Sequence, residues 1–217
     1  MRRGAAAEDR LDYRLLAVLA AIDLCFVALY GINATTSLLH RNRLFAIQWD
    51  GGYPEWFQYT KELSIGVVLA LVAAVRRRSL YAVLSAMFLY LFADDFLMIH
   101  ERAGMFLASI FGLEARFGLK PVDLGELGAY AVIAAVFGAA SVLAYRRSDA
   151  ATRAVGRWFL VLIALLAFAG VAMDMAHAAM ESSAMAPLFT LLEDGGEMVV
   201  MSAITALSVG LFTAPSR

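Results

Sequence analysis

The sequence predicts an all-α, polytopic membrane protein with six transmembrane helices and both termini on the cytoplasmic side. Of the 217 residues, 62% are hydrophobic and 17% are charged, and the mean hydropathy is +0.72. Average soluble domains are about 45–50% apolar and about 25% charged, so this composition excludes a soluble fold. The net charge of −1 leaves no basic surface for phosphates, and we expect no nucleic-acid partner.

Six apolar stretches are long enough to cross a bilayer core of about 30 Å, which takes about 20 helical residues. The first follows MRRGAAAEDR, a start that is also typical of a signal peptide. Its apolar run is close to full spanning length and includes Asp23, so we expect a retained helix. The predicted spans, in a single transmembrane domain over residues 1–217, are 14–34, 60–76, 79–101, 126–145, 157–181 and 188–212.

The basic residues predict the orientation, because cytoplasmic segments carry an excess of Lys and Arg. With the N-terminus inside, twelve of the 18 basic residues lie on the cytoplasmic side. The short turn at 76–78 and the connection 146–157 contribute most strongly. We therefore expect an N-in, C-in protein of the inner (plasma) membrane, surrounded by membrane lipids.

Two longer loops are predicted on the outer side. Residues 35–59 are rich in Trp, Tyr and Phe, as in the aromatic belts of membrane proteins. Residues 103–125 begin with apolar side chains that predict a short amphipathic helix on the membrane surface; these are Met105, Phe106, Ile110 and Phe111. The sequence leaves open whether the loops only anchor the protein or also cover a site beneath them.

Acidic residues gather at the predicted outer ends of five helices. A charged residue at the centre of a membrane helix costs about 2.5–3.5 kcal/mol. Because the topology was assigned from basic residues alone, this convergence is an independent observation. It predicts one polar site near the outer face, opposed only by Lys61 and Arg102. The acids are Glu62, Asp94, Asp95, Glu101, Glu126, Asp174, Glu181, Glu193, Asp194 and Glu197.

Helical spacing predicts which of these residues lie on the same side of a helix, because positions three, four or seven apart share a face. In a regular helix Asp94 and Glu101 are about 10 Å apart along the axis, and Asp95 and His100 face different neighbours. Two layers are therefore expected. The deeper layer holds Asp94 or Asp95, Asp174, His177, Asp194 and Glu197, and the shallower layer holds His100, Glu101, Glu181 and Glu193.

Carboxylates and imidazoles at such spacings form dinuclear metal sites in helix bundles. Mixed oxygen and nitrogen ligands suit zinc, iron or manganese, so we expect a divalent metal ion. Expected ligands are Asp174, His177, Glu197, His100 and Glu101. Further ligands, orienting partners or a general base are expected among Asp94, Asp95, Glu181, Glu193 and Asp194. A proton or ion pathway, and a hydrogen-bonded network without an ion, remain as alternatives.

These motifs resemble those of a group of bacterial multi-helix membrane proteins without an assigned activity. The shared pattern is an acidic pair followed by His-Glu at the end of one helix, an Asp-Met or Glu-Met element on a later helix, and Glu-Glu/Asp-x-x-Glu-Met at the start of the last. In this chain these elements are Asp94-Asp95 with His100-Glu101, Asp174-Met175, and Glu193-Asp194 with Glu197-Met198. The resemblance implies that the cluster is one site, and it implies no reaction.

The leading functional hypothesis is a metal-dependent enzyme, a hydrolase or an oxidoreductase, that acts on a lipid or another membrane-embedded substrate. No catalytic residue is assigned. The first alternative is a proton- or cation-coupled transporter, although the inner halves of the helices hold almost no ionisable group besides Asp23. The second alternative is an accessory subunit that binds a membrane-protein partner.

Overall fold

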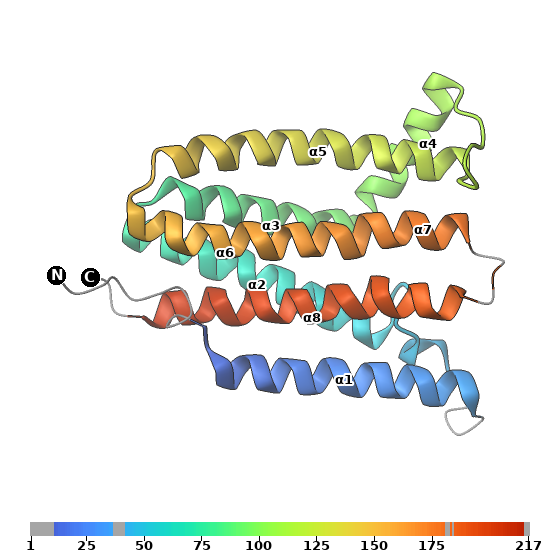
Figure 1. The fold of residues 1–217 in the computed structure, drawn as a ribbon, viewed down its shortest axis with the longest axis horizontal. Coiled ribbons are helices and arrows are strands. Elements are labelled where there is room, and N and C mark those ends of the chain that lie inside the picture. The colour runs from blue at the N-terminus through green and yellow to red at the C-terminus, as the bar shows by residue number, and fades with distance from the viewer. Residues whose placement is uncertain (1–10, 37–41, 181–182, 184, 215–217) are drawn as a thin grey trace.

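The computed structural model describes residues 11–36, 42–180, 183 and 185–214, which form an antiparallel helical bundle (Figure 1). Within them, six helical stretches are long and apolar enough to cross a membrane, which confirms the predicted fold class. The long helices are α1 (Tyr13–Thr35), α2 (Tyr53–Arg76), α3 (Ser79–Leu97), α5 (Pro121–Arg146), α6 (Ala150–Ala167) and α8 (Ala186–Thr213). The shorter elements are η2 (Arg43–Phe45), α4 (Ile99–Phe111), the π-helical turn η3 (Phe168–Met173) and α7 (Asp174–Ala179).

Three helices begin at least five residues earlier than the hydropathy predicted. α2 begins at Tyr53 rather than 60, and α5 begins at Pro121 rather than 126. Both carry a proline in the first turn, where a missing N–H costs nothing. α6 begins at Ala150 rather than 157, because the Asp149 carboxylate caps its first turn through the Thr152 N–H. The earlier starts place acids of α2 and α5 inside helices rather than at their ends.

The expected span 79–101 is wrong at its outer end, because the helix breaks at Met98. This residue has left-handed backbone angles, φ 53° and ψ 47°, and its N–H closes the last turn of α3. A non-glycine residue rarely adopts this conformation. The chain then changes direction into α4, whose exposed Phe106 and Phe111 confirm the amphipathic helix predicted there. α4 folds against the N-terminal end of α5 (Figure 1).

Glycines set the distance between α4 and α5. A Cβ on Gly125 would clash with the carbonyl oxygen of Gly104, and a Cβ on Gly104 would clash with the Glu126 side chain. Small residues of this kind let membrane helices approach closely. The contact holds the start of α4, which carries His100 and Glu101, beside Glu126 of α5.

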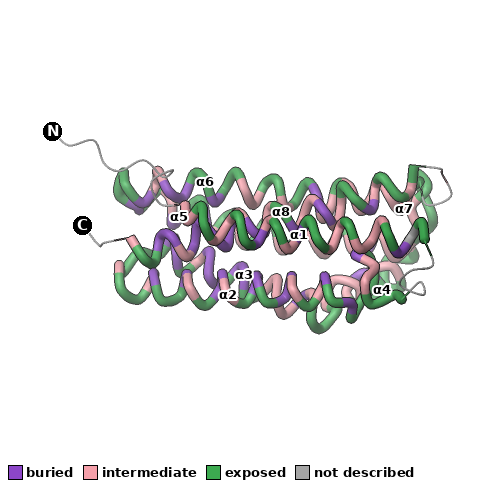
Figure 2. Tube along the Cα trace, turned by 90° about the horizontal axis from the view of Figure 1, so that it is seen from below, coloured by how far each residue is buried: buried purple, intermediate pink, exposed green. Residues whose placement is uncertain are grey.

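The tightly packed apolar core lies toward the end that carries the arginine-rich turns. Figure 2 shows the buried residues along the inner faces of the helices. The Arg76 guanidinium joins the end of α2 to the end of α8, because it donates to the carbonyls of Leu211 (2.6 Å) and Ala214 (3.1 Å). The side chains of this core are Ile65, Leu69, Val72, Leu80, Tyr81, Leu84, Met87, Phe88, Ala144, Val155, Phe159, Met201, Ile204, Leu207 and Leu211.

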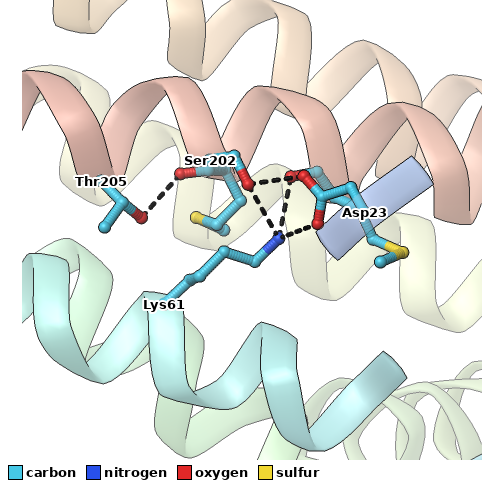
Figure 3. A network of polar contacts seen from close by, with 6 residues as sticks. Asp23, Lys61, Ser202 and Thr205 are labelled. Carbon is cyan, nitrogen blue, oxygen red and sulfur yellow. Dashed lines mark hydrogen bonds and ion pairs between the residues drawn. The ribbon is translucent and has the colours of Figure 1, made fainter. Parts of the chain in front are cut away.

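A buried ion pair joins α1, α2 and α8 (Figure 3). Lys61 Nζ lies 3.1 Å from Asp23 Oδ1 and donates to the Met198 carbonyl at 2.9 Å. Ser202 Oγ donates to Asp23 Oδ2 at 2.6 Å. Lys61 is 2% exposed and Asp23 is 1% exposed. Lys61 therefore has a direct partner, Asp23, that the prediction of its role opposite the acid cluster did not include.

We expect Asp23→Ala to destabilise the protein strongly, because it leaves the Lys61 ammonium buried without its counter-charge. Removing one partner of a buried pair typically costs about 3–5 kcal/mol. Thermal unfolding in detergent, followed by size-exclusion chromatography, measures the loss. The double variant Asp23→Ala/Lys61→Met is expected to regain much of it, since no charge is then buried. A single variant as stable as the wild type would contradict this account.

Candidate functional site

A polar cavity of about 540 Å³ lies at the end of the bundle opposite the arginine-rich turns. Its walls come from the loop 47–50 and from α2, α3, α4, α5, η3, α7 and α8, so the structure brings together the acids that the topology placed on one side. Asp94 lies beside it and lines an adjoining chamber, and Glu181 lies outside the described residues. The sequence-predicted residues that line the cavity are Asp95, His100, Glu101, Glu126, Asp174, His177, Glu193, Asp194 and Glu197.

The most compact group of metal-type ligands comprises Asp94, Asp95 and His100. One ligand atom from each residue lies within 4.8 Å of the other two. His100 Nδ1 is 3.1 Å from Asp94 Oδ2. The expectation that Asp95 and His100 face different neighbours is wrong, because it assumed an unbroken helix. The left-handed turn at Met98 carries His100 back toward the acidic pair.

The second histidine forms a pair across two helices. His177 Nδ1 of α7 lies 2.7 Å from Glu193 Oε2 of α8, and both side chains are partly buried. The sequence assigned His177 to a deep layer and Glu193 to a shallow one, and His100 and Asp94 were likewise divided. Both observed pairs cross that division, so the two-layer arrangement does not describe the contacts.

Several lining residues were not among the sequence-predicted ligands. The Tyr130 ring of α5 stacks on the His100 ring with 5.2 Å between centroids. Asp50 and Glu55 add carboxylates from the loop before α2 and from its first turn. Gly51-Gly52 followed by Pro54 is a helix-start signal that locates Glu55 in the sequence. Because 47–50 line the cavity, the aromatic loop covers part of the site.

The turn η3 shapes the wall opposite α8. It is a π-helical insertion between α6 and α7, and such turns occur frequently at functional sites. A Cβ on Gly170 would clash with Oε1 of Glu197. The Glu197 carboxylate therefore occupies the space that a side chain at 170 would fill. No periodicity in the sequence signals this contact.

A second, largely apolar chamber of about 700 Å³ adjoins the polar cavity. The chamber and the cavity have wall residues in common, among them Asp95, Tyr130 and Glu197. From there the chamber extends toward the middle of the bundle, past Phe137 of α5 and Ile163 of α6. The candidate site thus has a polar compartment and an apolar compartment that meet at the carboxylates.

The compact group offers two carboxylate oxygens and one imidazole nitrogen. Three protein ligands with an open fourth position are typical of catalytic zinc sites, and the same donor types suit iron and manganese. Two ligand atoms about 2.0–2.2 Å from a tetrahedral ion lie about 3.4 Å apart. The 3.1 Å between His100 Nδ1 and Asp94 Oδ2 is close to that separation, so the donor set fits a divalent ion.

The electrostatic environment of His100 favours its protonated form when no metal is bound. Burial alone lowers the pKa of His100, but the hydrogen bond and charge of Asp94 act in the opposite direction. The charges of Asp95 and Glu126 add to that effect. The net result is a pKa of His100 raised above the usual 6.5. The raised pKa extends the pH range over which a protonated His100 faces the Asp94 side chain.

We expect Asp94→Asn to destabilise the metal-free protein in a pH-dependent way. The pair contributes fully below about pH 6.5, the pKa of an unfolded histidine, and its contribution is lost as pH rises through the raised pKa of folded His100. Thermal unfolding in detergent with a chelator, over a pH series, measures the difference from wild type. Glu114→Gln, at an exposed position, is the control. A deficit in the Asp94 variant that is independent of pH would contradict the prediction.

Comparison with known proteins places the chain in a family. Residues 13–211 match the family described as Domain of unknown function (DUF8692). No curated protein and no solved structure matches the chain. The matched segment runs from the first residue of α1 into the last turn of α8, and it agrees with the resemblance above at the level of a family without an assigned activity. The chain belongs to the DUF8692 family.

Proposed function

We propose that this protein is an integral membrane enzyme with a divalent metal centre at the acidic end of its bundle. The observation that carries the proposal is the group of Asp94, Asp95 and His100, with ligand atoms within 4.8 Å of one another. His177, Glu193 and Glu197 line the same cavity and would hold a second ion or orient the first. The arginine-rich end faces the cytoplasm in this proposal, so the centre opens to the outer side of the plasma membrane.

Unsatisfied polar atoms support a missing cation. Glu62 Oε2, Asp194 Oδ2 and Gln58 Oε1 are buried and have no hydrogen-bond partner. Gln58 lines both compartments, Glu62 lines the apolar one and Asp194 lines the polar one. Burying carboxylates without partners costs several kcal/mol. A bound cation, or protons on some of the acids, would offset this cost, as Lys61 does for Asp23.

The protein groups are arranged for acid–base chemistry beside such an ion. A bound metal of this kind would lower the pKa of its water and polarise a carbonyl or phosphoryl oxygen. The His177–Glu193 pair lies in the same cavity and can hold a proton between Nδ1 and Oε2. Tyr130 restricts the ring of His100 by stacking on it. These features support a hydrolytic or redox reaction at the cavity.

The distribution of polar groups favours an enzyme over a transporter. The acids that line the cavity lie at one end, and tightly packed apolar side chains fill the other. The deepest ionisable pair in the described residues, Asp23 with Lys61, is neutralised and hydrogen-bonded rather than open to a cavity. A proton or cation crossing the membrane needs polar steps along its path, and the apolar core offers few.

We expect purified wild-type protein to contain zinc, iron or manganese, and Asp94→Ala and His100→Ala to lose most of it. Each substitution removes one of three closely spaced ligands. Elemental analysis by mass spectrometry, after isolation without chelators, measures the metal per chain. Glu114→Ala removes an exposed acid away from the cavity and is expected to retain the wild-type content. Folded wild-type protein that neither contains nor takes up these metals would rule out the proposal.

Gly170→Ala is expected to lower the affinity for the metal without unfolding the protein. The added methyl group displaces the Glu197 carboxylate, the far end of a flexible side chain, rather than backbone. Titration of the metal-free protein with Zn²⁺ or Mn²⁺ measures the change. Gly138→Ala on α5 is the matched control, since its Cβ meets nothing within 4 Å, and it is expected to bind metal normally. Equal affinities in the two variants would mean that Glu197 does not contribute.

A further inference from the structure

The apolar chamber is not explained by a metal centre alone. A site for small water-soluble molecules needs only the polar cavity, yet a larger apolar space of about 700 Å³ continues from it. The size is typical of ligand pockets, which run from about 300 to 1,000 Å³. Among its wall residues are Met87 and Leu91 of α3, Phe137 of α5 and Leu166 of α6. All of these belong to membrane-spanning helices.

The chamber reaches the outside of the bundle between α5 and α6. Ala131 and Ala134 of α5 and Ala167 of α6 line it and are also exposed. α5 packs mainly against α3 and α4 rather than against α6. The opening lies within spans on both sides, so it faces hydrocarbon and not water. What enters through it must come from the bilayer.

The end of the chamber that meets the polar cavity is itself polar. Asp94, Asp95 and Tyr130 form part of its wall, together with the buried Glu62 and Gln58. Glu62 Oε2 and Gln58 Oε1 have no hydrogen-bond partner, and their residues are only 2% and 8% exposed. A molecule that fills this space needs a hydrocarbon part for the walls and a polar group for that end. A bilayer lipid has both.

We propose that the chamber binds one hydrocarbon chain of a bilayer lipid, which enters between α5 and α6 and presents its polar group to the acids. That this lipid is the substrate rests on the proposed metal centre. The binding of the chain does not, because it depends only on the apolar walls and their opening to the bilayer. The substrate class is then a lipid with an ester, phosphate or other oxygen-bearing group next to its chain.

The test uses a long-chain alcohol that carries a photoreactive diazirine near the end of its hydrocarbon chain. An alcohol is chosen because its uncharged hydroxyl group makes its binding little dependent on a bound metal ion. Protein in phosphatidylcholine nanodiscs is irradiated with the probe, and labelled residues are mapped by mass spectrometry. We expect labels on Phe137, Ile163 and Leu166 of the chamber, measured relative to the outward-facing Val132 and Val136. Labelling no stronger in the chamber than on that outward face would overturn the proposal.

Two variants of α5 separate the chamber from the general lipid surface. Ala134→Phe places a ring in the opening, and we expect it to lower chamber labelling several-fold. Ala139→Phe adds the same ring at an exposed position of the same helix that does not line the chamber, and it is expected to leave the labelling unchanged. Equal labelling in the two variants would overturn the proposal.

The metal content of the same samples distinguishes failure of this proposal from failure of the proposed function. Labelling of the chamber in a protein that neither contains nor takes up metal supports lipid binding and rules out the metal centre. A metal-containing protein without chamber labelling keeps the metal centre and overturns lipid binding. Because Ala134→Phe lies outside the compact ligand group, its metal content is expected to equal that of the wild type.

Discussion

The main constraint on this structure is the negative charge of carboxylates that lie in helices of a membrane protein, away from water. Each of these charges needs a cation, a proton or hydrogen-bond donors. The Asp23–Lys61 pair shows one solution, in which a lysine, a serine hydroxyl and a backbone carbonyl satisfy the charges among three helices. At the acidic end the same solution is not repeated, because the basic side chains that contact Asp94 and Glu193 there are histidines. Histidine is also a metal ligand, and a cation between these residues would balance the acids as Lys61 balances Asp23.

The two ends of the bundle differ in structure: one holds the packed apolar core, and the other holds the candidate site. At the arginine-rich end, large apolar side chains and the Arg76 contacts hold α2, α3, α6 and α8 together. That packing leaves the acidic end free to depart from regular helix geometry, with a left-handed turn at Met98 and the π-helical turn before Asp174. Irregular backbone costs free energy, and a well-packed core elsewhere can support it. The two irregular turns are also the ones that place His100 and accommodate Glu197.

The sequence predicted the number of spans and the convergence of acids, because both depend on coarse properties. Long apolar runs specify helices, and alternating helix direction then determines which ends meet. It did not predict which acids touch, since that depends on local breaks. The regular-helix assumption separated Asp95 from His100, and only the φ of Met98 brings them together. The sequence also did not predict the partner of Lys61, whose long side chain reaches Asp23 on α1.

Gly170 marks the limit of what a single sequence reveals about this site. As a letter it is one small residue in an apolar helix, where tight packing is the usual explanation. In the structure its missing side chain makes room for a carboxylate at the boundary between the polar cavity and the apolar chamber. A residue that contributes only empty space has no chemical signature of its own. Its role follows from Glu197, which lies 27 positions further along the chain, and so from the fold alone.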